Sequence, residues 1–339
     1  MKKQPKKKIV LNFLILVIIF AIMIYLGKNS FGSIFAELKS TKVSLLIIIT
    51  FLGILYQYFE GCVMKEIVKD FTTDFTPWDG MLTSFYASFT RIVTFGAGTF
   101  VAEVNYYMKK KIKMSQGIGA SVLRMIMYKA AIVTFALLGL IFQFSTLTAY
   151  KPQWISLILT GIILTSLLVI AMLLLSLSIN VQVAVLLFCN KFISNQKIRN
   201  FIDEVNLQIN ALHGAMRSVL KNRSSLLKIY AFSLLKVAIW YVIPYVCLMD
   251  EVDSLNFFLT FSLISFTLAL AGVIPSPAGI GSFEFVYLLL FKPVFGTVNA
   301  VSSMLLYRYA TYILPFVLGF FVFLRERRKV IREEIEEIE

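Results

Sequence analysis

The chain has 339 residues, of which 58% are hydrophobic and 15% charged, with a formal net charge of +14. This composition excludes a soluble globular protein and predicts an all-α polytopic membrane protein, a single integral membrane domain over residues 1–339. Basic loops at a membrane surface account for the positive charge, so we expect no nucleic-acid partner. The 3 cysteines have no paired spacing, and we expect neither a metal nor a cofactor.

Nine apolar runs follow one another along the chain. The first is preceded by the basic segment Met1–Lys8 and is followed by no small-residue cleavage site, which predicts a retained span rather than a removed signal peptide. Several runs reach the length of about 20 residues that a helix needs to cross a bilayer, and Ile280–Phe291 does not. In order, the runs are Ile9–Leu26, Val43–Phe59, Met81–Val104, Ile118–Phe144, Trp154–Phe188, Leu226–Met249, Phe257–Val273, Ile280–Phe291 and Val298–Leu324.

The lysines and arginines predict how these runs cross the membrane. The N-terminal lysines and the basic cluster Lys109–Lys113 both belong inside, because basic residues concentrate in cytoplasmic loops. The run Met81–Val104 is therefore predicted to be a re-entrant hairpin that breaks at Gly96–Gly98 and returns the chain to the inside. We expect about 6 full transmembrane helices and two broken units, residues 81–108 and 257–292, which enter from opposite faces as an inverted repeat.

Several parts of this topology are predicted only in outline. The second broken unit is either a hairpin or two short spans, and charge leaves both open. Both termini are expected in the cytoplasm of a bacterial plasma membrane, with the acidic turn Asp250–Asp253 outside. Apolar side chains recur every three or four residues over 195–222, which predicts an amphipathic helix on the cytoplasmic membrane surface. His213 lies beside its apolar face and is expected to pack there rather than to catalyse a reaction.

A short motif occurs twice, once in each broken unit. Each copy interrupts an apolar stretch with glycine and places a glutamate just beyond the interruption, and an arginine follows that glutamate after 21 or 24 residues. Paired broken segments in the two halves of a membrane protein point to a transport site. The first copy comprises Gly98, Glu103 and Arg124, and the second comprises Pro277, Gly279, Gly281, Glu284 and Arg308.

Ionisable residues at membrane depth are the candidates for a substrate site. Each costs about 2.5–3.5 kcal/mol by insertion scales, so a chain rarely carries one without a role. Snorkelling from the end of a span is the alternative for Arg124, Lys129 and Arg308. Glu103 and Glu284 have shorter side chains, which favours a functional or buried paired role. The full set is Arg91, Glu103, Arg124, Lys129, Lys236, Glu284 and Arg308.

The chemistry of this set suits the headgroup of an anionic lipid. Arginine donates paired hydrogen bonds to phosphate, and a half-helix that begins after a Gly/Pro break presents free backbone N–H groups. A carboxylate would balance an arginine in the empty site, or accept an ammonium group of the headgroup. Across the pseudo-twofold axis, we expect Glu103 to lie beside Arg308 and Glu284 to lie beside Arg124.

The same motif carries a family resemblance that covers nearly the whole chain. Its most specific parts are Pro277–Glu284 and Leu306–Arg308, which resemble the transmembrane region of lysylphosphatidylglycerol synthases, the multiple peptide resistance factors. The chain looks more closely like their stand-alone, flippase-like members, although Ala278 stands where a glycine is common and no proline precedes Gly98. The resemblance implies movement of lipids, such as aminoacylated phosphatidylglycerol, between leaflets. Full-length members also carry a soluble lysyltransferase domain, for which this sequence shows no counterpart.

We therefore predict a lipid translocase, without covalent chemistry, for an anionic, aminoacylated or glycosylated lipid. No phosphate loop, nucleophile elbow or zinc spacing is visible in the sequence. One alternative is the membrane subunit of a lipid-modifying synthase that acts with a separate transferase, and another is a membrane scaffold. The expected partners are a membrane phospholipid or glycolipid, together with a second copy of the chain or a soluble transferase.

Overall fold

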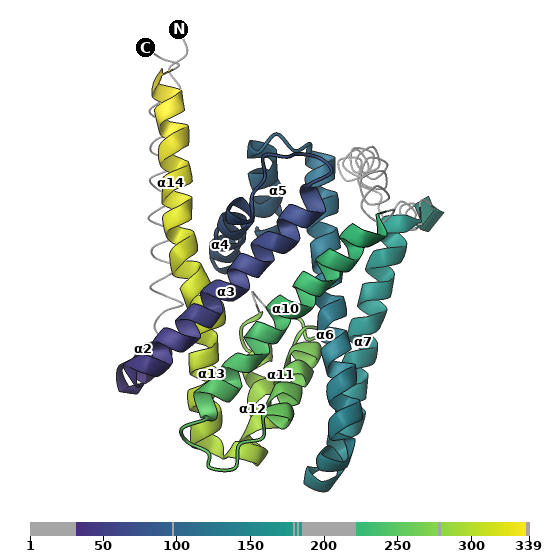
Figure 1. The fold of residues 1–339 in the computed structure, drawn as a ribbon, viewed down its shortest axis with the longest axis vertical. Helices are drawn as coiled ribbons and strands as arrows, with labels where there is room; N and C mark the ends of the chain where they lie inside the picture. The colour runs from purple at the N-terminus through teal and green to yellow at the C-terminus, as the bar shows by residue number, and fades with distance from the viewer. Residues whose placement is uncertain are drawn as a thin grey trace, which may run out of the picture.

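Every element in the described part of the chain is helical in the computed structural model (Figure 1). The structure describes residues 32–96, 98–178, 180–181, 183–184, 222–276 and 279–336. An all-helical fold is expected in a bilayer, because a helix forms the hydrogen bonds of its backbone N–H and C=O groups within its own segment. The principal elements are α2 (Gly32–Ser40), α3 (Val43–Val68), α4 (Pro77–Val93), α5 (Thr99–Lys109), α6 (Met114–Tyr150), α7 (Gln153–Leu177), α10 (Arg223–Leu248), α11 (Phe257–Ala271), α12 (Ser282–Phe295), α13 (Thr297–Arg308), the π-helix η3 (Tyr309–Ile313) and α14 (Leu314–Glu336).

Five of the described helical segments are long and apolar enough to cross a membrane. They are α3, α6, α7, α10 and the continuous run Thr297–Lys329, which contains α13, η3 and most of α14. These five coincide with five of the predicted full spans. The remaining predicted span, Ile9–Leu26, lies outside the described residues, as does the predicted amphipathic helix except for its last residue, Asn222.

The two broken units are helical hairpins. In the first, the turn Thr94–Gly98 joins α4 to α5, and the two helices pack against each other. In the second, α11 and α12 pack in the same way around the segment that follows Ala271. Helices of 15 and 14 residues are about 22 Å long, which is shorter than the hydrocarbon core of about 30 Å. These lengths favour the hairpin over two full spans for the second unit, and the re-entrant form stays a prediction.

The hairpins lie in opposite halves of the molecule. In Figure 1, α4 and α5 occupy the upper half, and α11 and α12 occupy the lower half, as expected for two units that enter from opposite faces. The inverted repeat itself stays a prediction. The upper end carries the α5–α6 connection with its lysines, and the lower end carries the acidic α10–α11 connection with Asp250, Glu251 and Asp253 (Figure 1). This separation of charge is the one that the positive-inside rule describes. The assignment of the upper end to the cytoplasm stays a prediction.

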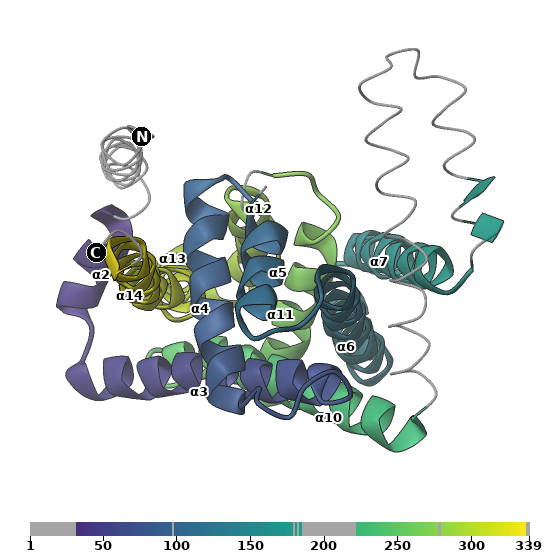
Figure 2. The same ribbon diagram turned by 90° about the horizontal axis from the view of Figure 1, so that it is seen from above.

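Helix α4 is held between its neighbours by direct backbone contact. Figure 2 shows α3 and α10 along one edge, with the hairpins in the middle between α14 and α6. A Cβ atom added at Gly61 of α3 would lie 2.1 Å from the carbonyl oxygen of Pro77, and one added at Gly319 of α14 would lie 2.1 Å from that of Phe85. Small residues at such crossings let membrane helices approach closely. They fix the position of α4, which carries Arg91.

Replacing Gly61 by alanine is expected to lower the free energy of unfolding by about 1–3 kcal/mol, because α3 and α4 must separate to admit the methyl group. Thermal unfolding of the purified protein in detergent measures the effect. Gly117→Ala is the matched control, because a Cβ atom at Gly117 of α6 would meet Tyr107 at 3.4 Å, an ordinary contact distance. Equal unfolding temperatures for the two variants would contradict the close crossing of α3 and α4.

Candidate functional site

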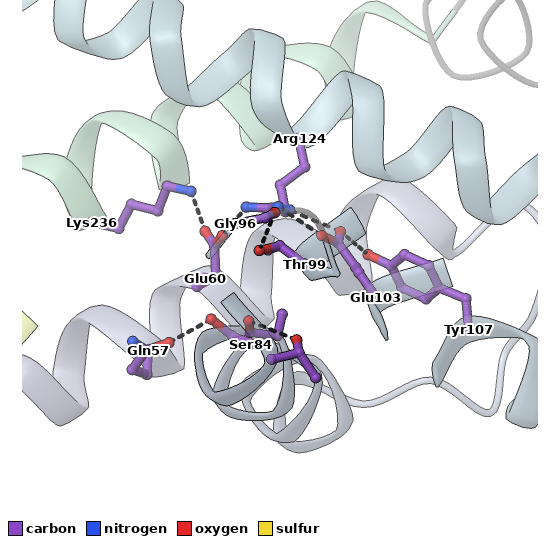
Figure 3. Close-up of polar contacts among 11 residues, drawn as sticks. Gln57, Glu60, Ser84, Gly96, Thr99, Glu103, Tyr107, Arg124 and Lys236 are labelled. Atoms are coloured by element: carbon purple, nitrogen blue, oxygen red, sulfur yellow. Dashed lines mark hydrogen bonds and ion pairs between the residues drawn. The ribbon is translucent and has the colours of Figure 1, made fainter. Parts of the chain in front are cut away.

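A buried chain of four charged side chains connects the first hairpin to three long helices (Figure 3). Arg124 of α6 binds Glu103 of α5 through two parallel hydrogen bonds, Nε to Oε1 at 2.9 Å and Nη2 to Oε2 at 2.7 Å. Its Nη1 donates to Oε1 of Glu60 on α3 at 2.6 Å, and Lys236 of α10 donates to the other oxygen of Glu60. Two carboxylates and two cations thus compensate one another.

Three members of this network are deeply buried, and the side chain of Arg124 is 20% exposed. Glu103 and Lys236 are 0% exposed and Glu60 is 2% exposed. Tyr107, one turn further along α5, donates a hydrogen bond to Glu103 at 3.3 Å. Burying isolated charges costs several kcal/mol per ion, and the cost is offset only when each charge is paired and hydrogen-bonded, as it is here. The network therefore ties α3, α5, α6 and α10 together at one depth in the fold.

A second ion pair lies at the start of the other hairpin's returning arm. Arg308, the last residue of α13, donates from Nε to Glu284 at 2.6 Å and from Nη2 to the carbonyl oxygen of Gly279 at 2.6 Å. The other oxygen of Glu284 accepts the backbone N–H of Gly281 at 2.7 Å, which caps the N-terminus of α12. The Arg308 guanidinium also lies over the ring of Phe283, 4.3 Å from its centroid. One arginine thus fixes both the helix start and the turn before it.

The predicted pairing across the pseudo-twofold axis is wrong. Each arginine binds the carboxylate of its own half: Arg124 binds Glu103, and Arg308 binds Glu284. The reason is the hairpin geometry. The returning arm of each hairpin packs against the helix that follows it, α5 against α6 and α12 against α13. Snorkelling is also wrong for the two arginines, because their guanidinium groups are bound to carboxylates within the fold.

The predicted glycines have different roles in the two turns. Gly279 and Gly281 have φ angles of +79° and +90°, a backbone region that disfavours other residues. Gly98 has a φ of −85°, and its N–H instead donates to the side chain of Thr94 at 2.7 Å. The left-handed glycine of the first turn is Gly96, with a φ of +99°. Pro277, which was predicted to be part of the site, lies outside the described residues.

Two cavities lie at the two hairpin turns and share part of their lining. One, of about 290 Å³, is bordered by the second turn and by Arg308, and the other, of about 110 Å³, is bordered by Thr99 at the start of α5 and by the buried network. The residues common to both are Arg91, Tyr128, Trp240 and Thr311. The shared residues place Arg91, on the last turn of α4, between the two cavities.

Arg91 differs from the other buried arginines in its partners. Among the described residues it forms no ion pair with a carboxylate, and its Nε is buried without a hydrogen-bond acceptor. Its guanidinium lies 5.3 Å from the centroid of the Tyr312 ring. Three more cavity-lining groups also have buried polar atoms without a partner: Trp240 Nε1 and the hydroxyls of Tyr307 and Tyr312. All four can donate hydrogen bonds, and an anion such as a phosphate would supply acceptors for them.

Sequence reasoning missed part of this site. Glu60 follows the predicted apolar run Val43–Phe59 and was not among the candidate residues, yet α3 continues to Val68 and buries Glu60. A signal was present, since Gly53, Gln57 and Glu60 recur at helical spacing on the buried face of α3. Lys236 was weighed only as an ionisable residue at membrane depth. In the described part of the chain, no three His, Cys, Asp or Glu side chains gather in a way that could hold a metal ion.

Comparison with known proteins agrees with the motif. The family model described as the lysylphosphatidylglycerol synthase TM region matches residues 9–319, which is nearly the whole chain. No curated protein matches the chain. The match contains both hairpins, both ion-paired motifs and Arg91, and it confirms the family resemblance. The chain is therefore a membrane protein that belongs to the family of the lysylphosphatidylglycerol synthase transmembrane region.

Proposed function

We propose that the protein is a lipid translocase that carries the phosphate-bearing headgroup of a phospholipid between the two leaflets. The single observation that supports this most strongly is Arg91, a cation between two cavities that has no carboxylate partner among the described residues. An unpaired arginine at membrane depth is costly, and such residues mark substrate pathways. The planar guanidinium group matches a phosphodiester, to which it can donate two hydrogen bonds.

The two hairpins supply a polar path from each side. The turns before α5 and α12 approach the cavities from opposite halves of the fold, and each turn exposes irregular backbone that hydrocarbon would not tolerate. A headgroup entering either cavity meets Arg91, because Arg91 lines both. The acyl chains stay in the bilayer while the headgroup crosses. The two ion-paired motifs hold the walls of this path, since all of their carboxylates are already bound.

The direct test is lipid transfer in proteoliposomes. Phosphatidylglycerol with a fluorophore on one acyl chain is placed in both leaflets, and dithionite is added outside to quench the accessible label. Protein-free vesicles should lose about half of the signal, and active translocase should let nearly all of it be quenched. Phosphatidylglycerol that stays protected at the protein-free level would contradict the proposal.

Replacing Arg308 by alanine is expected to lower the transfer rate about tenfold or more and to leave a folded protein. The change removes the hydrogen bonds to Glu284 and to the Gly279 carbonyl, so the turn before α12 loses the contact that fixes it. Raising the activation free energy of lipid transfer by about 1.4 kcal/mol lowers the rate tenfold. Glu284→Gln, which weakens the same pair from the other side, should act in the same direction. Normal transfer by both variants would exclude a role for this turn.

A further inference from the structure

The two cavities contain more cations than carboxylates, and this excess positive charge favours some lipid headgroups over others. We propose that the site selects a headgroup with a net negative charge and no ammonium group, such as that of phosphatidylglycerol, over its lysylated form. This selectivity rests on the translocase function proposed above. It differs from what the family name suggests, and it follows from how the carboxylates, aromatic rings and cations of the site are engaged.

Each oxygen of the carboxylates at the cavities already accepts a hydrogen bond from the protein, so none is a free counter-ion for an ammonium group. Both oxygens of Glu60 are bound, one by Arg124 and one by Lys236. Both oxygens of Glu103 are bound by Arg124. Those of Glu284 are bound by Arg308 and by a backbone N–H. Glu60 is the only aspartate or glutamate in the described linings of the two cavities, so a lysyl group entering them meets no free anion.

Several aromatic rings that line the cavities are also engaged by the protein's own cations. Arg308 lies 4.3 Å from the centroid of Phe283, and Arg91 lies 5.3 Å from that of Tyr312. Lys236 lies 5.1 Å from the centroid of Tyr128. Aromatic rings are the usual alternative to carboxylates for holding an ammonium group, because the ring face is negative. Phe283, Tyr312 and Tyr128 already have a positive neighbour, which makes these three rings poor sites for another cation.

The cations exceed the carboxylates. The cavities and the networks attached to them contain five cations and three carboxylates, so the described site has a formal charge of +2. The members are Arg91, Arg124, Lys129, Lys236 and Arg308 against Glu60, Glu103 and Glu284. Among the described residues, Arg91 and Lys129 have no carboxylate partner, and Lys129 Nζ donates to the carbonyl of Gly272 at 3.4 Å. Like charges a few ångströms apart repel strongly where water is scarce.

The headgroup of phosphatidylglycerol matches both the excess positive charge of the site and its hydrogen-bond donors without partners. Its phosphodiester supplies the negative charge and the acceptors that Arg91 Nε and Trp240 Nε1 lack. Its uncharged glycerol hydroxyls can exchange hydrogen bonds with the hydroxyls of Tyr307 and Tyr312. Lysylation adds two ammonium groups to the same headgroup and gives neither of them a partner. The lysylated headgroup would then bring two positive ammonium groups into a cavity that is already positively charged.

The deciding experiment compares the two lipids in one preparation. Phosphatidylglycerol and lysylphosphatidylglycerol with identical labelled acyl chains are assayed in proteoliposomes at about pH 6, below the α-amino pKa of about 7.7, so that both lysyl amines are charged. We expect phosphatidylglycerol to cross about tenfold faster or more. Equal or faster transfer of the lysylated lipid would overturn the selectivity and leave the translocase function standing. Transfer of neither lipid would overturn both proposals.

A charge-swap series at Lys129 tests the cause of the selectivity. Lys129→Gln removes one uncompensated cation, and Lys129→Glu adds a free carboxylate at the same place in the cavity lining. The ratio of phosphatidylglycerol to lysylphosphatidylglycerol transfer should fall from the wild type to Lys129→Gln and again to Lys129→Glu. Each variant is first compared with the wild type by thermal unfolding in detergent, and the ratio within one variant is independent of how much protein is active. An unchanged ratio across the series would refute cavity charge as its origin.

Discussion

Replacing Arg91 by glutamine is expected to abolish lipid transfer and to leave the protein at least as stable as the wild type. Arg91 contributes no ion pair with a described residue, so its loss removes a cost of about 2.5–3.5 kcal/mol that no carboxylate offsets. Its two donors to a phosphate contribute about 1.5–3 kcal/mol each as charged hydrogen bonds, and losing both lowers the rate by at least about a hundredfold. Dithionite quenching and thermal unfolding measure the two quantities separately.

The control for this variant removes an equivalent charge from the surface. Lys42 has a side chain that is 68% exposed and binds Asp250 at the acidic end of the fold, so Lys42→Gln should leave transfer unchanged. Arg91→Lys keeps the charge but loses the planar fork, and it should recover only part of the rate. An Arg91→Gln protein that transfers phosphatidylglycerol at the wild-type rate would remove the central support for the proposed function.

Replacing Arg124 by glutamine should greatly lower the stability of the protein, in contrast to Arg91→Gln. Without Arg124, the buried carboxylates of Glu60 and Glu103 keep only Lys236 as a cationic partner. Breaking a buried ion pair from one side costs about 3–5 kcal/mol, because an uncompensated charge stays in the interior. We expect a much lower unfolding temperature in detergent and a poor yield of folded protein.

The origin of this effect can be separated from the loss of one side chain. The double variant Arg124→Gln with Glu103→Gln removes a cation and an anion together, so it should be more stable than Arg124→Gln alone. Arg308→Gln is the matched comparison in the second half of the fold. It should cost less, because its partner Glu284 has a side chain that is 29% exposed and can meet solvent. Equal destabilisation by Arg124→Gln and by the double variant would show that charge compensation is not the cause.

The hydropathy and charge of the sequence predicted much of the architecture. Both signals are local: an apolar run of sufficient length must be a helix in a bilayer, and glycines within the run predict where it breaks. The lysine cluster after Met81–Val104 required this run to return to the same side, and the hairpin of α4 and α5 follows. The arginines and glutamates of the two motifs were found in the same way, by their cost at membrane depth.

The partners of these residues depended on tertiary contacts. Glu103 pairs with Arg124 rather than with Arg308 because α5 packs on α6, and the sequence carries no signal of that packing. Glu60 entered the network because α3 continues beyond its apolar run, and Lys236 reaches it from 176 residues away.

The sequence by itself predicted the family, the five described spans, the first hairpin and the charged residues available to a site, because hydropathy, charge and motif are all read from neighbouring residues. Only the tertiary structure decided which charges are compensated and which are free. Arg91 and Arg124 look alike in the sequence, as single arginines in apolar surroundings. One is bound by two carboxylates, and the other lies between two cavities with none among the described residues. Whether a buried charge holds a fold together or is available to bind a ligand depends on what packing brings within hydrogen-bonding distance of it.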